Sequence, residues 1–173
     1  MKFFRSLSLA LPLVVGIFLL QNCGGGSNNK NWVVVYNPTQ PEMLNPTNYS
    51  DAFSSFIMDN IFQTLYVMEE NPPYGLHPQL AKGQPVVSAN GLEYTFEIRP
   101  EAKWDDGSPI TAKDYAFSLK ILKVKKVKCD NQRPLFDNVK DVVIDPQNER
   151  KFTVRLSQTY AEAEFLLGEE LRI

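Results

Sequence analysis

The chain has 173 residues, of which 43% are hydrophobic, so it is long and apolar enough to bury a sizeable core. Its formal net charge is −2, and this lack of a basic excess argues against nucleic acid as a partner.

The first 22 residues have the pattern of a secretory signal peptide. Lys2 and Arg5 provide a basic start, and residues 7–20 form an apolar segment that is too short to cross a bilayer comfortably. This leader contains two basic residues and no acidic ones, so its removal lowers the net charge from −2 to −4. We therefore expect residues 1–22 to be removed and the rest to be exported.

Residues 20–23 resemble a bacterial lipobox, in which the cysteine receives lipid and becomes the new N-terminus. Asn22 departs from the small residue that usually precedes that cysteine, and an unmodified Cys23 behind a plain signal peptide is the alternative. Residues 23–31 include three consecutive glycines, a composition typical of a flexible tether. Lipidation of Cys23 leaves Cys129 without a partner, which excludes a disulfide framework.

The next segments predict a strand, a turn and a helix. Residues 32–36 form a continuous apolar run, which predicts a strand buried on both faces. Asn45, within the turn at 43–46, has a short side chain that can bond its own backbone. Ser50 or Asp51 can cap the following helix, whose apolar residues fall four apart. We expect this apolar stripe to pack into the core rather than line a ligand box. The stripe consists of Phe53, Ile57, Ile61 and Leu65, with Phe56, Met58 and Phe62 beside it.

A loop and a hairpin follow. Residues 71–75 are rich in proline and glycine, and His77 is expected to lie in the same loop region at the surface rather than act as a base or metal ligand. Asn90 and Gly91 form a strong hairpin turn, which places Val86 and Val87 antiparallel to the next strand.

Residues 92–119 combine a strand, a tight loop and a capped helix. Apolar and polar residues alternate over 92–98, which predicts a strand with one buried face. Residues 106–109 have turn chemistry, since glycine accepts positive φ and proline fixes φ. Thr111 and Asp114 have the spacing of a capping box at the start of a helix. The apolar stripe of that helix is Tyr115, Leu119 and Leu122.

The remaining chain contains a basic run, a second cysteine and another hairpin. Five lysines in residues 120–128 are expected to be the solvated side of a helix end rather than a lipid-binding surface. Cys129 has no partner at metal-ligand spacing and is expected to be an inert thiol. Residues 139–144 and 152–156 alternate around a turn at 145–148, which predicts a hairpin. A helix is expected to begin within 160–167.

Residues 94–114 resemble the signature region of the family-5 solute-binding proteins, the oligopeptide-, dipeptide- and nickel-binding receptors of bacterial ABC importers. In that family an aromatic strand ending in Leu-Arg is followed by the pattern Lys-Trp-x-Asp-Gly-x-Pro-Leu-Thr-Ala-x-Asp. The corresponding residues of this chain are YTFEIR at 94–99 and KWDDGSPITAKD at 103–114. Residues 43–46 resemble the family's Thr-Leu-Asp-Pro, and residues 77–81 contain its Pro-x-Leu-Ala. A tight turn and a helix cap explain the glycine, proline, threonine and aspartate, but they do not explain Trp104 or the full register.

The resemblance implies an α/β (α+β mixed) fold: part of lobe I of a type II periplasmic-binding-protein fold, with a mixed sheet, hairpins and packed helices. Family members are much longer and have two lobes around a cleft, so residues 32–173 are expected to be an incomplete N-terminal lobe. The implied function is capture of peptides or a similar small solute for ABC permease subunits, on the periplasmic or extracellular side of the membrane. In the family the ligand main chain pairs with a segment that corresponds here to Ser50, Asp51 and Ala52. That role competes with simple capping of the next helix, and both can hold.

Two other function classes were weighed. An enzyme is disfavoured because Asp105 and Asp106 are adjacent in a turn and point apart, whereas paired acid and base groups must converge on a substrate. One histidine and no nucleophile elbow, phosphate loop or CxxC leave no catalytic set, so no cofactor or metal is predicted. A structural or adhesive surface lipoprotein needs only an anchor and a stable fold, and only the signature at 94–114 speaks against it.

Overall fold

The computed structural model describes residues 35–36 and 38–173. Residues 37–173 form a compact unit, described here by itself. Val35 and Tyr36 are 59% and 85% exposed and belong to no strand, so the predicted buried strand at 32–36 is wrong at that end. An apolar run favours burial only where another element covers it. The leader, Cys23 and the tether lie outside the described residues.

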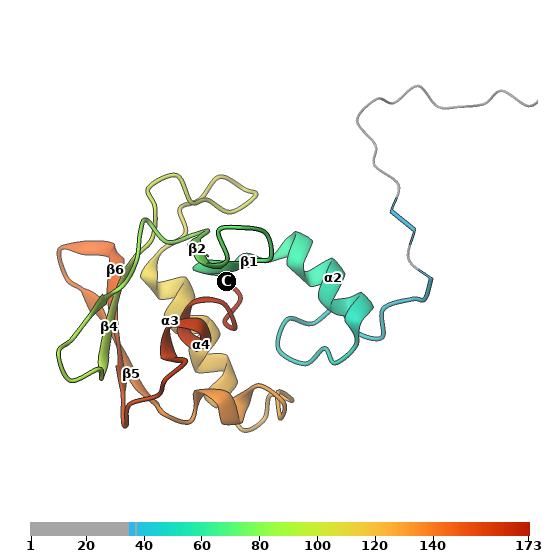
Figure 1. Ribbon diagram of the computed structural model, residues 1–173. Helices are drawn as coiled ribbons and strands as arrows, with labels where there is room; N and C mark the ends of the chain where they lie inside the picture. The colour runs from blue at the N-terminus through green and yellow to red at the C-terminus, as the bar shows by residue number, and fades with distance from the viewer. Residues whose placement is uncertain (1–34, 37) are drawn as a thin grey trace, which may run out of the picture. The chain divides into compact units, whose positions relative to one another are not determined.

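Helices and two small sheets make up the described part of the compact unit (Figure 1). The helices are α2 (Ala52–Ile61), α3 (Ala112–Lys123), α4 (Ala163–Gly168) and the 3-10 turn η1 (Arg133–Phe136). The first sheet pairs β1 (Tyr66–Glu69) with β2 (Gly75–Pro78). The second has the order β3-β4-β6-β5, built from β3 (Val86–Val87), β4 (Glu93–Glu97), β5 (Val139–Asp145) and β6 (Asn148–Leu156). All pairings between these strands are antiparallel, in place of the mixed sheet that was expected.

The predicted hairpins of the larger sheet are confirmed. Gly91 has a φ of +67°, which glycine adopts without strain, and Val86 pairs with Thr95 across that turn. The hairpin of β5 and β6 brings Val142 opposite Val154. These tight turns explain why the strands run antiparallel, since a short connection reverses the chain direction.

The core forms where α3 lies against one face of the larger sheet (Figure 1). Tyr115 of α3 packs on Phe152 of β6 with ring centroids 4.5 Å apart, and Phe152 packs on Phe96 of β4 at 5.6 Å. The Tyr115 hydroxyl donates to the Leu167 carbonyl of α4 at 2.9 Å, so the buried phenol also attaches the last helix. Burial raises the pKa of Tyr115. The predicted stripe of α3 is confirmed, because Leu119 and Leu122 are buried as well.

The connection from β4 to α3 follows the predicted turn and cap. Gly107 has a φ of +85°, and the Asp106 carboxylate accepts from the Ser108 N–H at 2.8 Å. The Asp114 carboxylate accepts from the backbone N–H of Thr111 at 2.7 Å and from its hydroxyl at 3.0 Å. The capping box therefore starts α3 at Ala112. All five lysines of the basic run are exposed, as predicted, although α3 ends at Lys123.

The apolar stripe predicted for α2 is buried only in part, contrary to expectation, since Phe53 and Ile57 are half-buried. Phe56 and Ile61 are 51% and 61% exposed, and the buried residues of α2 are Ser54 and Met58. The helix ends at Ile61, so Leu65 is buried as part of the following chain rather than as a member of the stripe. Periodicity shows that a helix has an apolar face, but it does not show whether another element covers that face.

The hairpin of β1 and β2 was not foreseen. Tyr66 begins β1, and the loop predicted at 71–75 joins it to β2, which ends at Pro78. His77 therefore lies in a strand rather than a loop, paired with Val67, and its Nε2 is 2.9 Å from the Pro73 carbonyl. These four-residue strands are too short to show a clear alternation of apolar and polar residues.

Phe96→Ala is expected to lower the free energy of unfolding by about 3–5 kcal/mol, because the ring is 1% exposed at the centre of the aromatic cluster. Phe117→Ala removes the same ring from a position that is 62% exposed on α3, and about 0.5 kcal/mol is expected there. Urea unfolding of the two variants, followed by circular dichroism, measures both changes. Equal effects would contradict the assignment of the core.

Candidate functional site

The three predicted ligand-contacting residues lie together at the start of α2. Ser50 and Ala52 are exposed, and Asp51 is the N-cap residue. The Asp51 carboxylate accepts from the backbone N–H of Ser54 at 2.8 Å and from its hydroxyl at 2.5 Å. Of the two residues that could cap the helix, Ser50 and Asp51, the structure selects Asp51, and its side chain is committed to the helix.

The turn before α2 is folded back onto the helix. Asn45 accepts from the backbone N–H and the hydroxyl of Thr47, both at 2.9 Å, as its short side chain suggested. The Met43 N–H donates to the hydroxyl of buried Ser54 at 3.2 Å. Residues 43–62, which we call the loop–helix segment, are thus organised by hydrogen bonds of their own.

The Asp51 carboxyl is held in its ionised form. Hydrogen bonds from the Ser54 hydroxyl and then from the Ser54 N–H lower its pKa below 3.8. Such bonds favour the carboxylate because they donate to negative charge. The pKa is lower in the folded state, so the contribution of Asp51 to stability is present above pH 3.8 and is lost as pH falls through the folded-state pKa.

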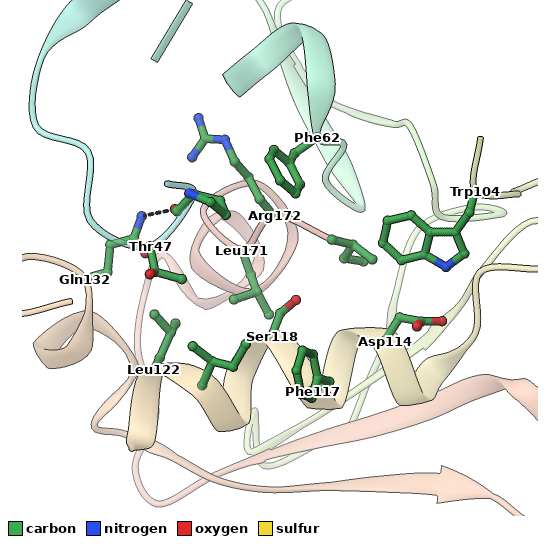
Figure 2. Close-up of a pocket in the computed structure, with 13 residues that line it drawn as sticks. Thr47, Phe62, Trp104, Asp114, Phe117, Ser118, Leu122, Gln132, Leu171 and Arg172 are labelled. Atoms are coloured by element: carbon green, nitrogen blue, oxygen red, sulfur yellow. Dashed lines mark hydrogen bonds between the residues drawn. The ribbon is translucent and has the colours of Figure 1, made fainter. Parts of the chain in front are cut away.

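An apolar groove of about 330 Å³ lies between the loop–helix segment, the outer face of α3 and the last residues of the chain (Figure 2). We call it the α3 groove. Figure 2 shows Phe62 and Arg172 on one side, the α3 residues Phe117 and Ser118 on the other, and Trp104 at one end. Its lining residues are Pro46, Thr47, Phe62, Trp104, Asp114, Phe117, Ser118, Ile121, Leu122, Gln132, Leu171, Arg172 and Ile173. Its volume is at the lower end of the range of small-ligand pockets, about 300–1,000 Å³.

Three polar or charged side chains that line the α3 groove already have partners within the chain. Asp114 is held by the capping box, and Gln132 donates to the Pro46 carbonyl at 3.3 Å (Figure 2). Arg172 donates to Asp59 at 2.5 Å. Apolar contact is therefore what the groove mainly provides.

Sequence reasoning missed the α3 groove. Turn and cap chemistry did not account for Trp104, and the structure places this side chain at the groove wall. Phe117 could have indicated an apolar surface on the outer face of α3. It lies outside the buried stripe of that helix, so this large apolar side chain faces away from the sheet. The contribution of residues 171–173 to the groove was not predictable, because it depends on how a distant part of the chain returns to α3.

The carboxylates weighed for catalysis do not converge. Asp106 bonds Ser108 in its own turn, and Asp114 bonds Thr111 in the helix cap. Within residues 35–36 and 38–173, no group of three or more histidine, cysteine, aspartate or glutamate residues is placed to hold a metal ion. Cys129 is free and buried, with Arg133 Nη2 at 3.1 Å from its Sγ.

Over the same described ranges, no helix is long and apolar enough to span a membrane.

Comparison with known proteins identifies relatives that bind solutes. Residues 75–170 match the model of bacterial extracellular solute-binding proteins, family 5. The oligopeptide-binding protein AliB of Streptococcus pneumoniae is 36% identical, over 70% of this chain and 19% of that protein. A dipeptide-binding protein of Lactococcus lactis is 25% identical, over 98% of this chain and 32% of that protein.

A solved structure has the same fold. The pheromone receptor PrgZ, whose mode of peptide binding was determined, superposes with a TM-score of 0.65 at 27% identity. The match covers 73% of this chain and 27% of PrgZ. The chain thus spans between about a fifth and a third of the lengths of these three proteins.

Ser54→Ala is expected to raise the pKa of Asp51, because the Ser54 hydroxyl is the largest cause of its low value. The measurement is an NMR titration of the Asp51 side-chain carboxyl carbon in both proteins. Asp106, whose pKa is lowered by Ser108 instead, is the internal control and should titrate identically in both. An unchanged Asp51 titration would show that the hydroxyl does not hold the carboxylate.

Proposed function

Because the chain belongs to family 5 of the bacterial extracellular solute-binding proteins, we propose that it takes part in capturing peptides for an ABC importer. The members of this family are binding proteins rather than enzymes. The observation that carries the proposal is the family match over residues 75–170, together with relatives named for oligopeptide and dipeptide binding. Permease subunits of the importer are the proposed protein partners.

The proposed ligand contacts are the backbone groups of Ser50, Asp51 and Ala52. Two features support this: Asp51 has extended dihedral angles, φ −108° and ψ 149°, and both of its neighbours are exposed. An extended backbone presents N–H and C=O groups to a peptide main chain, which suits a receptor for many sequences. Capping uses the Asp51 side chain, and the Asp51 carbonyl accepts from the Ser55 N–H at 3.1 Å. The groups proposed to meet a peptide are therefore the N–H groups of residues 50–52 and the Ser50 carbonyl, so capping and peptide contact are compatible.

The α3 groove extends the proposed surface. Pro46 and Thr47 line the groove and belong to the same loop as Ser50. A peptide along residues 50–52 would find apolar surface beside it for one or two side chains. Backbone contacts would then provide general affinity, and the groove would favour apolar side chains.

We further propose that residues 1–22 are a signal peptide and that lipid on Cys23 anchors the protein through the tether at 23–31. The basic start, the apolar segment and the glycine run of the sequence support this. The anchored protein would face the periplasmic or extracellular side, with residues 32–173 as part of the N-terminal lobe. A structural or adhesive lipoprotein is the alternative, and it would show no response to peptides.

Peptide binding by residues 24–173 alone is expected to be weak. A few backbone hydrogen bonds contribute about 0.5–1.5 kcal/mol each, against an association cost of at least ~4 kcal/mol. We expect an affinity for a mixed tri- to pentapeptide library no tighter than roughly 100 μM, or about −5.5 kcal/mol. At millimolar peptide, NMR should show shifts of the amides of Ser50 to Ala52, with calorimetry as a check on affinity.

Ala52→Pro is the matched variant for that experiment. Ala52 is the first residue of α2, where proline is tolerated, and the extended Asp51 is compatible with a following proline. The variant removes one N–H while keeping the helix, so it should reduce the peptide-induced shifts, whereas Ala52→Gly should not. Absence of any shift near residues 50–52 in the unmodified chain would refute peptide contact there and favour the adhesive alternative.

Cys23→Ser is expected to move the protein from the membrane fraction to the soluble fraction of the producing bacterium, because the serine cannot accept the lipid. Mass spectrometry of the unmodified protein should find a lipid-modified N-terminus at Cys23. Cys129→Ser is the control and should remain in the membrane fraction. An exported protein with an unmodified Cys23 would rule out the anchor.

A further inference from the structure

α2 contributes little to the apolar core that unites the rest of the described chain. The main cluster of buried side chains takes no member from α2, and Phe56 and Ile61 of this helix are exposed. Its contacts with the preceding loop run through Ser54, inside the loop–helix segment. The position of this segment therefore depends on a small number of contacts with the rest of the fold.

Arg172 makes two of those contacts with one guanidinium. Its Nη2 lies 2.5 Å from Asp59 Oδ1 on α2, a residue 113 positions away in the sequence. Its Cζ lies 4.8 Å from the ring centroid of Tyr49, within the range of a cation–π interaction. The Arg172 side chain is 14% exposed and that of Asp59 is 55% exposed, so the pair is partly shielded from solvent on the arginine side.

Tyr49 and Asp59 lie on either side of the proposed peptide-contacting residues. Tyr49 immediately precedes Ser50, and Asp59 lies in the last turn of the helix that starts at Ala52. One cation thus holds both ends of the stretch that contains Ser50 to Ala52. The neighbouring Ile173 N–H donates to the Gln63 carbonyl at 2.8 Å, which fixes the chain next to Arg172 against the residue that follows Phe62.

We propose that Arg172 is a positioning residue, which clamps the loop–helix segment through Asp59 and Tyr49 and thereby sets the orientation of the Ser50–Ala52 backbone and the width of the α3 groove. The expected consequence for peptide binding rests on the proposed function. The clamp, meaning the contacts of Arg172 with Asp59 and Tyr49, does not depend on it. The guanidinium suits this role because its planar face stacks on a ring while its N–H groups bind a carboxylate. Phe62 moves with the segment, and it lines the groove opposite α3 (Figure 2).

Hydrogen exchange of backbone amides tests the clamp in the intact chain. Arg172→Met removes the charge but keeps an apolar stem of similar length in the groove wall. Loss of the charged hydrogen bond and of the cation–π contact should raise the exchange rates of α2 amides about tenfold. Amides of β4 and β6 should keep their rates, which also shows that the variant folds.

Three further variants distinguish a clamp from a general loss of stability. Asp59→Asn should accelerate the same α2 amides, and the exchanged pair Asp59→Arg with Arg172→Asp should recover most of the protection. Lys82→Met breaks the ion pair of Lys82 with Glu97 at 3.0 Å, far along the chain from α2, and should leave α2 unchanged. Unchanged α2 exchange in Arg172→Met, equal acceleration of α2 and β4, or no recovery in the exchanged pair would each overturn the clamp.

The peptide experiment separates this inference from the proposed function. If the unmodified chain shows peptide-induced shifts at Ser50 to Ala52, Arg172→Met should weaken them at least threefold in apparent affinity, as expected for a contact stretch that is less often in its binding orientation. Faster α2 exchange with no peptide response in the unmodified chain would support the clamp and reject peptide contact. Peptide shifts that are identical in both proteins would reject the positioning role.

Discussion

The contact of Tyr115 with Phe152 determines much of this structure. It places α3 on one face of the larger sheet, and the stack continues through Phe96 to Tyr66 of the first sheet. The Tyr115 hydroxyl then bonds α4 through Leu167, so one side chain connects the sheet, the central helix and the end of the chain. Because a helix repeats every 3.6 residues, burial of Tyr115, Leu119 and Leu122 turns Phe117 outward. The α3 groove is a consequence of that orientation.

Apolar packing holds one part of the described chain together, and polar contacts hold another part. The strands, α3 and α4 share a continuous core, whereas the loop–helix segment is organised by Asn45, Asp51 and Ser54 and joined to the rest through groups such as Arg172 and Gln132. Partly exposed ion pairs are weaker than buried apolar contacts. Segments held in this way open at lower free energy than the core, and binding residues are often found on them. We therefore expect the loop–helix segment to open more readily than the core built from the strands, α3 and α4.

The proposed mode of peptide capture follows from the same division. A receptor for many peptides gains from backbone contacts, which every peptide can make, and from apolar surface that does not demand one side chain. In the proposed mode Ser50 to Ala52, within the loop–helix segment, would provide the first, and the α3 groove beside them would provide the second. The chain spans about a fifth to a third of the lengths of the three relatives compared, so the proposed contacts concern only that share of such a protein.

The sequence by itself determined the local elements: the hairpins at 88–92 and 145–148, the turn at Gly107, the capping box of α3 and its buried stripe. It also placed the cap of α2 at Ser50 or Asp51, and the structure selects Asp51. Each depends on residues within a few positions of one another, so its chemistry is visible in a short window. The candidate contact residues Ser50, Asp51 and Ala52 came from the resemblance to the family rather than from local chemistry. Only the tertiary structure decided that the apolar face of α2 is covered only in part, that Phe117, Trp104 and Leu171 share a groove, and that Arg172 reaches Asp59. These features depend on which distant elements meet, and a pattern of hydrophobicity specifies that a face is apolar without specifying what covers it.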